Sequence, residues 1–331
     1  MVKVRASRSA AALLVASGLA LAACGGGGKD EAGTPEGFAP TTAYLRQVVA
    51  SSKATPHTFE ARLSLGLPGP ADDAPVTTGR SDGRWTYTRS DSRKFVEASG
   101  DKLPFDPAKI NWVTETVSDG RTFYMKAPFI KDVAAARPDQ PVPPVVDVLR
   151  ELGDTWAQVD LSALGDPVPA EVGKWLPGTR DLGVRQALQV LLTARTVEDE
   201  GPATLGGVKV HRLAAEIGFA DLMEAEGVDL NSALASPTTP TGLANVVNHA
   251  ELKAQLWIDG DGHIRRLIVD TGSTFEDIAK VVGEKDVPDE FKIQGVFTFS
   301  HYGDRSIDVV PPAAAQAKDV TGPLHAIDVG Q

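Results

Sequence analysis

The sequence has little cysteine, few aromatic residues and no excess of positive charge. One cysteine occurs in 331 residues, which excludes an internal disulfide, a zinc site built on several thiolates and an iron–sulfur cluster. Acidic residues number 44 and basic residues 33, so the formal net charge is −11 and nucleic acid is a poor partner. The composition, 42% hydrophobic and 23% charged, is that of a globular protein and not of a polytopic membrane protein or a wholly disordered chain.

The single cysteine lies directly after a secretion signal. The chain begins with a basic segment and a short apolar run, made of Lys3, Arg5 and Arg8 and then of residues 10–21. That run is too short to span a bilayer and is typical of a signal peptide. Its end, Leu21-Ala22-Ala23-Cys24, is similar to a bacterial lipobox, which implies cleavage before Cys24 and a diacylglycerol and palmitate anchor on it. We therefore predict a signal peptide at 1–23 and a lipoprotein held by Cys24 on the extracytoplasmic face of the cell membrane.

A polar, glycine-led stretch follows the cysteine. Residues 25–40 read GGGGKDEAGTPEGFAP and contain too little apolar surface to fold. We expect residues 24–40 to form the lipidated cysteine and a flexible tether. Residues 41–331 are long enough for one large core and are predicted to form a single domain.

The first part of this domain changes from a helical to a strand-like period. Thr41 or Thr42 can cap a helix that runs to about Ser51 with apolar residues on one face. Between residues 59 and 67, apolar side chains alternate with polar or small ones, as in a strand of an antiparallel sheet with one buried face. Asp-Gly pairs suit tight hairpin turns, and they separate strand-like runs at 82–83, 119–120 and 261–262. The pattern predicts a meander of hairpins.

The second half of the domain also shows strand-like alternation, and it contains one strongly predicted helix. Strands are expected at 208–213, 251–258, 264–270 and 291–300. Apolar residues at helical spacing predict a helix at 184–195 that lies across the apolar face of the sheet, with weaker helices at 219–226 and 243–248. Residues 127–181 are rich in proline, so we predict a segment that crosses the sheet without a central strand and carries a short helix at 145–152.

Catalytic and metal-binding patterns are incomplete throughout. The Gly79–Gly83 segment matches a nucleophile elbow, but a strand-like run follows it where a helix is required, so it predicts a hairpin. The Asp259–Gly262 segment begins like a calcium loop, but His263 and Ile264 replace an oxygen ligand and a glycine, and this favours a hairpin tip. The six histidines are scattered and are expected at the surface or at strand ends. We predict no cofactor, no metal and no enzymatic activity, although spacing alone does not exclude a carboxylate pair.

Three segments carry a resemblance to a known group of proteins. The segments 256–267, 208–213 and 297–303, the last followed by Ile307-Asp308-Val309 and a Pro-Pro pair, resemble strands of actinobacterial lipoproteins of the LppX/LprG type, which belong to the LolA/LolB-like superfamily. The resemblance implies an α+β fold in which a strongly curved antiparallel sheet forms an open half-barrel with helices on its concave face. It also implies binding and carriage of the acyl chains of a lipid or lipoglycan, without catalysis.

These expectations define a candidate ligand site. If the apolar faces enclose a cavity, its wall is predicted to include Leu63, Leu65, Leu188, Leu191, Leu192, Leu256, Ile258, Phe297 and Phe299. The alternative is a protein-interaction or sensing module on the same fold, in which bulky side chains fill the cup and an envelope protein is the partner. The two hypotheses differ in whether the sheet encloses space for a ligand.

Overall fold

The described residues form one open sheet of 12 strands in the order β12-β6-β5-β4-β3-β2-β1-β11-β10-β9-β8-β7. The computed structural model describes residues 40–65, 76–91, 93, 110–136, 144–164, 188, 190–225, 246–247, 249–270 and 293–329. The strands are β1 His57–Leu65, β2 Val76–Ser81, β3 Thr86–Asp91, β4 Val113–Ser118, β5 Thr122–Lys126, β6 Trp156–Asp160, β7 Ala194–Leu205, β8 Val208–Gly218, β9 Glu251–Asp259, β10 Ile264–Asp270, β11 Ile293–Ser300 and β12 Ala317–Asp319. Every neighbouring pair is antiparallel except β12 with β6.

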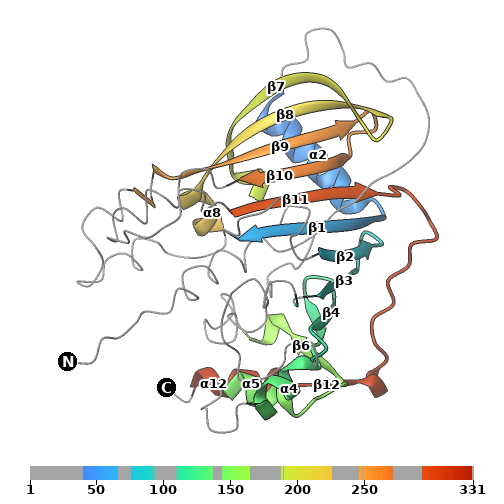
Figure 1. Ribbon diagram of the computed structural model, residues 1–331, viewed down its shortest axis with the longest axis vertical. Coiled ribbons are helices and arrows are strands. Elements are labelled where there is room, and N and C mark those ends of the chain that lie inside the picture. Colours follow the sequence, from blue (N-terminus) through green and yellow to red (C-terminus); the bar gives the residue numbers. More distant parts are fainter. Residues whose placement is uncertain are drawn as a thin grey trace.

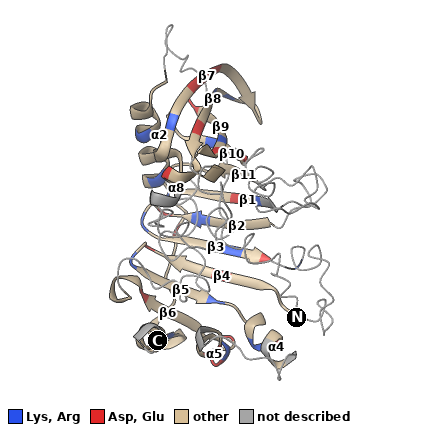
Figure 2. Cartoon of the chain, turned by 90° about the vertical axis from the view of Figure 1, so that its left-hand side faces the viewer, with Lys and Arg blue, Asp and Glu red and all other residues tan. Residues whose placement is uncertain are grey.

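The described residues form few helices beside this sheet. They are α2 Thr42–Ala54, α4 Phe129–Ala136, α5 Pro144–Arg150, α8 Phe219–Ala225 and α12 Thr321–Val329, with the 3₁₀ turns η3 Leu161–Ala163, η4 Leu191–Thr193 and η5 Ala314–Gln316. In Figure 1, β7 and β8 arch around α2 at one end of the sheet, whereas α4, α5 and α12 gather at the other end. Figure 2 shows the strands stacked along the long axis from β7 to β6. The predicted fold class, a curved open sheet with helices, is confirmed.

All three predicted Asp-Gly turns are present, and each has its glycine at a positive φ angle. Gly83, Gly120 and Gly262 have φ angles of +90°, +86° and +77°, which a glycine adopts without strain. The preceding aspartate closes the first of these turns with its side chain. Asp82 Oδ1 accepts hydrogen bonds from the backbone N–H groups of Arg84 and Trp85 at 2.8 and 2.6 Å.

The predicted first helix is also present and packs against the sheet. Thr41 Oγ1 accepts a hydrogen bond from the backbone N–H of Tyr44 at 3.1 Å, so Thr41 is the N-cap. The helix buries Leu45, Val48 and Val49 and contacts η4, β7 and β10. It ends at Ala54, three residues later than expected.

One face of the sheet, here called the inner face, carries the core. Strand register aligns Leu213, Leu256, Leu267, Phe297 and Ala61 in a row across β8, β9, β10, β11 and β1. Each of these side chains is at most 4% exposed. The row therefore runs beneath α2 and joins strands that are far apart in sequence.

Two expectations about local structure were wrong. The helix predicted to reach Arg195 ends earlier, because η4 is followed at Ala194 by β7, whose backbone pairs with β8 over its length. The proline-rich segment does contribute a central strand, since β6 lies between β5 and β12. No proline lies within Trp156–Asp160, so the ladder keeps all its donors there.

The remaining helix predictions stand as follows. The helix predicted at 145–152 is α5, shifted to Pro144–Arg150 with proline at its first position. The one predicted at 219–226 is α8. Of the one predicted at 243–248, the structure describes only Val246 and Val247, both helical. The signal peptide, Cys24 and all but the last residue of the tether lie outside the described residues.

Among the described residues, no helix is both long enough and apolar enough to cross a bilayer.

Candidate functional site

The structure brings most of the predicted cavity residues together in one core. Leu188, Leu191, Leu256, Ile258, Phe297 and Phe299 are all at most 1% exposed, and Leu192 packs against them with partial burial. Leu63 and Leu65 lie in β1, but their side chains are outside the described part. A role of these residues in ligand contact stays a prediction.

This core is packed by the protein's own side chains at the α2 end. Leu45, Val48 and Val49 of α2 belong to the same cluster as Phe59, Phe297 and Phe299. Among the described residues, a small cavity at the other end has a volume of about 10 Å³, about the room of one water molecule. It is lined by Met125, Ala127, Ile130, Leu149, Leu152, Gly153 and Thr155. Because an acyl chain needs far more space, this cavity does not hold one as it stands.

The middle of the inner face is polar, a feature that the sequence analysis missed. The side chains of β2, β3 and β4 on this face are small or hydroxylated, and we call them the hydroxyl strip: Thr77, Gly79, Ser81, Thr86, Thr88, Ser90, Thr114, Thr116 and Ser118. Strand register continues the rows of the strip into Phe123 and Met125 of β5 and then into β6. The inner face is therefore apolar at both ends and hydroxylated between them.

Most of the hydroxyl strip is buried and bonds to itself. Ser81, Thr86, Thr88, Thr116 and Ser118 are between 1% and 6% exposed. The hydroxyls of Thr88 and Thr116 lie 2.6 Å apart, and those of Thr77 and Ser90 lie 2.7 Å apart. Alternation of Ser and Thr with larger residues along 86–90 and 114–118 is the sequence signal that could have revealed the strip.

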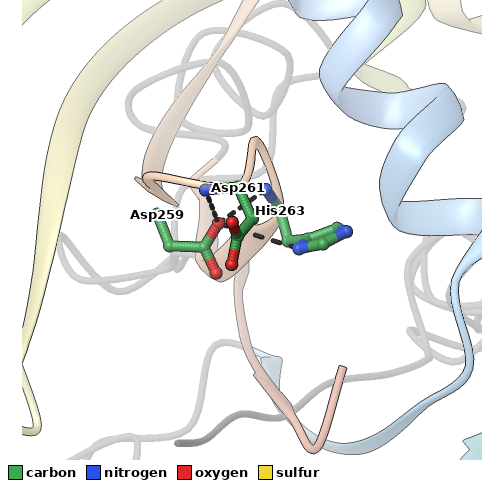
Figure 3. Close-up of side chains that lie close together, drawn as sticks. All are labelled: Asp259, Asp261 and His263. Carbon is green, nitrogen blue, oxygen red and sulfur yellow. Dashed lines mark hydrogen bonds and ion pairs between the residues drawn. The ribbon is translucent and has the colours of Figure 1, made fainter. Parts of the chain in front are cut away.

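A second polar group lies at the β9–β10 turn, where Asp259, Asp261 and His263 come together (Figure 3). Their possible ligand atoms lie within 4.8 Å of one another, which is a spacing that a metal ion could use. Asp259 Oδ1 accepts from the backbone N–H groups of Asp261 and His263 at 3.0 and 2.9 Å, and Oδ2 accepts from Arg265 Nε. The Asp259 carboxylate thus accepts hydrogen bonds from its own turn and from the Arg265 guanidinium, which agrees with the predicted hairpin tip. The group is better described as a turn cluster than as a metal centre.

Two histidines near this turn have pKa values below the ordinary value of histidine. Burial lowers the pKa of His57 to about 4, against a smaller opposing effect of its hydrogen bond to the carbonyl of Thr55. Burial also lowers the pKa of His263, with Arg265 in the same sense and Asp259 opposing. His57 begins β1 and is therefore a strand-end residue, as expected, and its side chain is only 1% exposed.

Comparisons with known proteins give structural neighbours only. No family model matches the chain, and no curated protein matches it in sequence. The lipoprotein LppX of Mycobacterium tuberculosis aligns with 81% of this chain and 97% of its own, at 11% identity and a TM-score of 0.39. LprF of Mycobacterium bovis aligns with 84% and 100%, at 14% identity and a TM-score of 0.34.

A third neighbour comes from a different bacterium. It is a putative outer membrane lipoprotein-sorting protein domain of Vibrio parahaemolyticus, which aligns with 81% of this chain and 93% of its own at 6% identity and a TM-score of 0.22. LppX, a namesake of the group that the sequence segments resemble, is thus also a structural neighbour.

Proposed function

We propose that this protein is a membrane-anchored, extracytoplasmic lipoprotein that binds the acyl chains of a lipid or lipoglycan on its inner face, as a non-catalytic carrier. The observation that carries the proposal is the division of this face into two apolar ends and a central hydroxyl strip. An amphiphile has the same two kinds of surface. Its chains gain about 0.8 kcal/mol for each CH₂ removed from water, and its hydroxyl or ester groups need hydrogen-bond partners.

The predicted anchor at Cys24 supports the same function. A tether at 24–40 lets the domain move relative to the bilayer while the lipid holds it there. The excess of acidic residues gives no electrostatic attraction to anionic headgroups, so the approach to the membrane depends on this anchor.

Binding on the inner face requires that the face opens. The apolar side chains beneath α2 are packed, and most of the hydroxyl strip is buried. The ligand would therefore replace contacts that the free protein makes with itself, and α2, which packs against η4, β7 and β10, is the element that we expect to move.

The direct test is native mass spectrometry of the mature chain carrying Cys24→Ser, before and after incubation with a fluorescent acyl probe and with phospholipid vesicles. We expect added mass that extracts as acylated lipid. The double variant Thr88→Val/Thr116→Val should change the lipid classes retained, whereas Thr78→Val, on the exposed outer side of β2, should retain those of the parent chain.

The packed core beneath α2 favours a second candidate, an interaction or sensing module for an envelope protein. This function predicts a bare polypeptide mass that no lipid or acyl probe changes. That result would overturn the carrier proposal.

A further inference from the structure

The end of α2 is fastened to the sheet through Thr55, the residue directly after the helix. The backbone oxygen of Thr55 lies 2.7 Å from His57 Nδ1, and its Oγ1 lies 3.2 Å from His263 Nε2. One turn earlier, Ser52 Oγ accepts a hydrogen bond from the backbone N–H of Ile264 at 3.0 Å. Thr55, His57 and His263 are called the α2 latch below.

The hydrogen bonds define the protonation of both imidazoles. A carbonyl oxygen only accepts, so His57 Nδ1 carries the proton and donates it to Thr55. The Thr55 hydroxyl already donates to the backbone oxygen of Ser51 at 2.9 Å, so His263 Nε2 must be the donor in its contact with Thr55 Oγ1. The other ring nitrogen of each histidine is buried and has no hydrogen-bond partner. Both rings are therefore neutral when the latch is closed.

The surroundings of the latch oppose a second proton on His57. Its ring lies 5.0 Å from that of Tyr302 and 5.9 Å from that of Phe299, so these neighbours are aromatic and offer no negative charge to an imidazolium. Tyr302 also stacks on His263 at 4.5 Å and has the Arg265 guanidinium 5.3 Å from its ring centre. A proton on either histidine thus enters a region that already contains a cation.

Charged and titratable groups lie on every element around the latch. They are Asp259, Asp261, Arg265 and Arg266 on the β9–β10 turn and β10, His301, Tyr302, Asp304 and Arg305 after β11, Glu60 and Arg62 on β1, and Tyr44, Arg46 and Lys53 on α2. Asp259 is the acidic group nearest to His263, with its Oδ1 3.7 Å from Nδ1, but it already pairs with Arg265. It offsets only part of the cost of protonating His263.

We propose that protonation of His57 and His263 opens the α2 latch and releases α2 from the inner face. Protonated His57 would bury an N–H group that has no acceptor, and this cost disappears once the ring reaches water. In the released form both histidines regain an ordinary pKa near 6.5, whereas the closed form holds that of His57 at about 4. Release therefore increases as the pH falls through this window. The device goes beyond the proposed function, since it does not depend on which ligand the inner face carries.

Linkage gives the expected size of the effect. With a pKa of about 4 when closed and 6.5 when open, His57 alone shifts the equilibrium toward release by roughly 20-fold between pH 7 and pH 5. Hydrogen exchange of the mature Cys24→Ser chain, followed by mass spectrometry and expressed as protection factors, measures this directly. Amides of residues 42–54 should lose at least about tenfold protection at pH 5, and amides of β4 and β5 should keep theirs.

Three variants separate the latch from general acid sensitivity. His57→Phe keeps an aromatic ring among Phe59, Phe299 and Tyr302 but cannot titrate, and His263→Gln keeps an N–H donor for Thr55 without titrating. Both should reduce the pH dependence of α2 protection. His301→Asn removes an exposed histidine that contacts Thr58, at a positive φ angle that asparagine tolerates, and should leave the pH dependence unchanged.

Each alternative result overturns the proposal. These results are unchanged α2 protection at pH 5, loss of protection in α2 and β4–β5 together, and parent-like pH dependence in both His57→Phe and His263→Gln.

Discussion

Thr88 of β3 and Thr116 of β4 face each other on the inner face with their hydroxyl oxygens 2.6 Å apart, and both side chains are at most 5% exposed. Each hydroxyl satisfies the other in a buried position. The pair joins two strands that meet at the centre of the hydroxyl strip, and two further hydroxyl pairs, Thr77 with Ser90 and Thr86 with Ser81, join β2 to β3.

This pairing predicts a non-additive effect of mutation. Thr88→Val alone leaves the Thr116 hydroxyl buried without its partner and should lower the free energy of unfolding by about 1–3 kcal/mol. The double variant Thr88→Val/Thr116→Val removes both hydroxyls at nearly constant shape and should cost less than the sum of the single changes. Urea denaturation of the parent chain, the two single variants and the double variant measures the coupling between the two hydroxyls. Additive losses of unfolding free energy would contradict the predicted coupling.

Gly79 is predicted to be intolerant of any side chain. A Cβ there would lie 2.2 Å from the backbone oxygen of Tyr87 and 2.3 Å from Cζ of Phe59. Because the first neighbour is backbone, Gly79→Ala should destabilise the protein by about 1–3 kcal/mol or more. Gly322→Ala in α12 is the control, since a Cβ at that position would meet nothing within 4 Å and alanine favours a helix. Equal thermal stability of Gly79→Ala and Gly322→Ala would show that the space around Gly79 is not too small for a side chain.

The free energy of unfolding should begin to fall at pH values well above those at which carboxylates take up protons. His57 has a folded pKa of about 4 and an unfolded value of 6.5, so the unfolded chain binds the proton more tightly. The stabilisation is complete above pH 6.5 and is lost as the pH falls toward 4. The shift corresponds to at most about 3 kcal/mol. Chemical denaturation between pH 7.5 and 4.5 should show this slope in the parent chain and a flatter one in His57→Phe.

Cys24 is predicted to decide where the protein resides. Cys24→Ser, made behind a signal peptide whose cleavage does not depend on Cys24, should remove the acyl mass from the mature chain and release the protein from the membrane fraction, because the tether offers no other apolar anchor. Intact-mass analysis and fractionation of cells that express both forms measure this. A membrane-bound Cys24→Ser chain that carries no acyl mass would disprove the anchor as its sole attachment.

Local pattern was enough to predict most elements of this protein. Alternation of apolar residues marked the strands β1, β8, β9, β10 and β11, and Asp-Gly pairs marked three turns, because side-chain period and turn conformation depend on residues within a few positions of one another. The cap of α2 at Thr41 depends on an equally short span. The lipobox at Cys24 is likewise a local signal, and it stays a prediction.

Only the tertiary structure decided which of these elements meet. The pairing of β12 with β6 aligns Ala317 with Trp156, and Thr55 meets His263 across 208 positions of sequence. The same long-range pairing made Ala194 the start of β7, where local period predicted a helix. It also placed hydroxyl residues of β2, β3 and β4 side by side and buried His57. Strand order and register arise from contacts between distant segments, and a window of neighbouring residues carries no information about them.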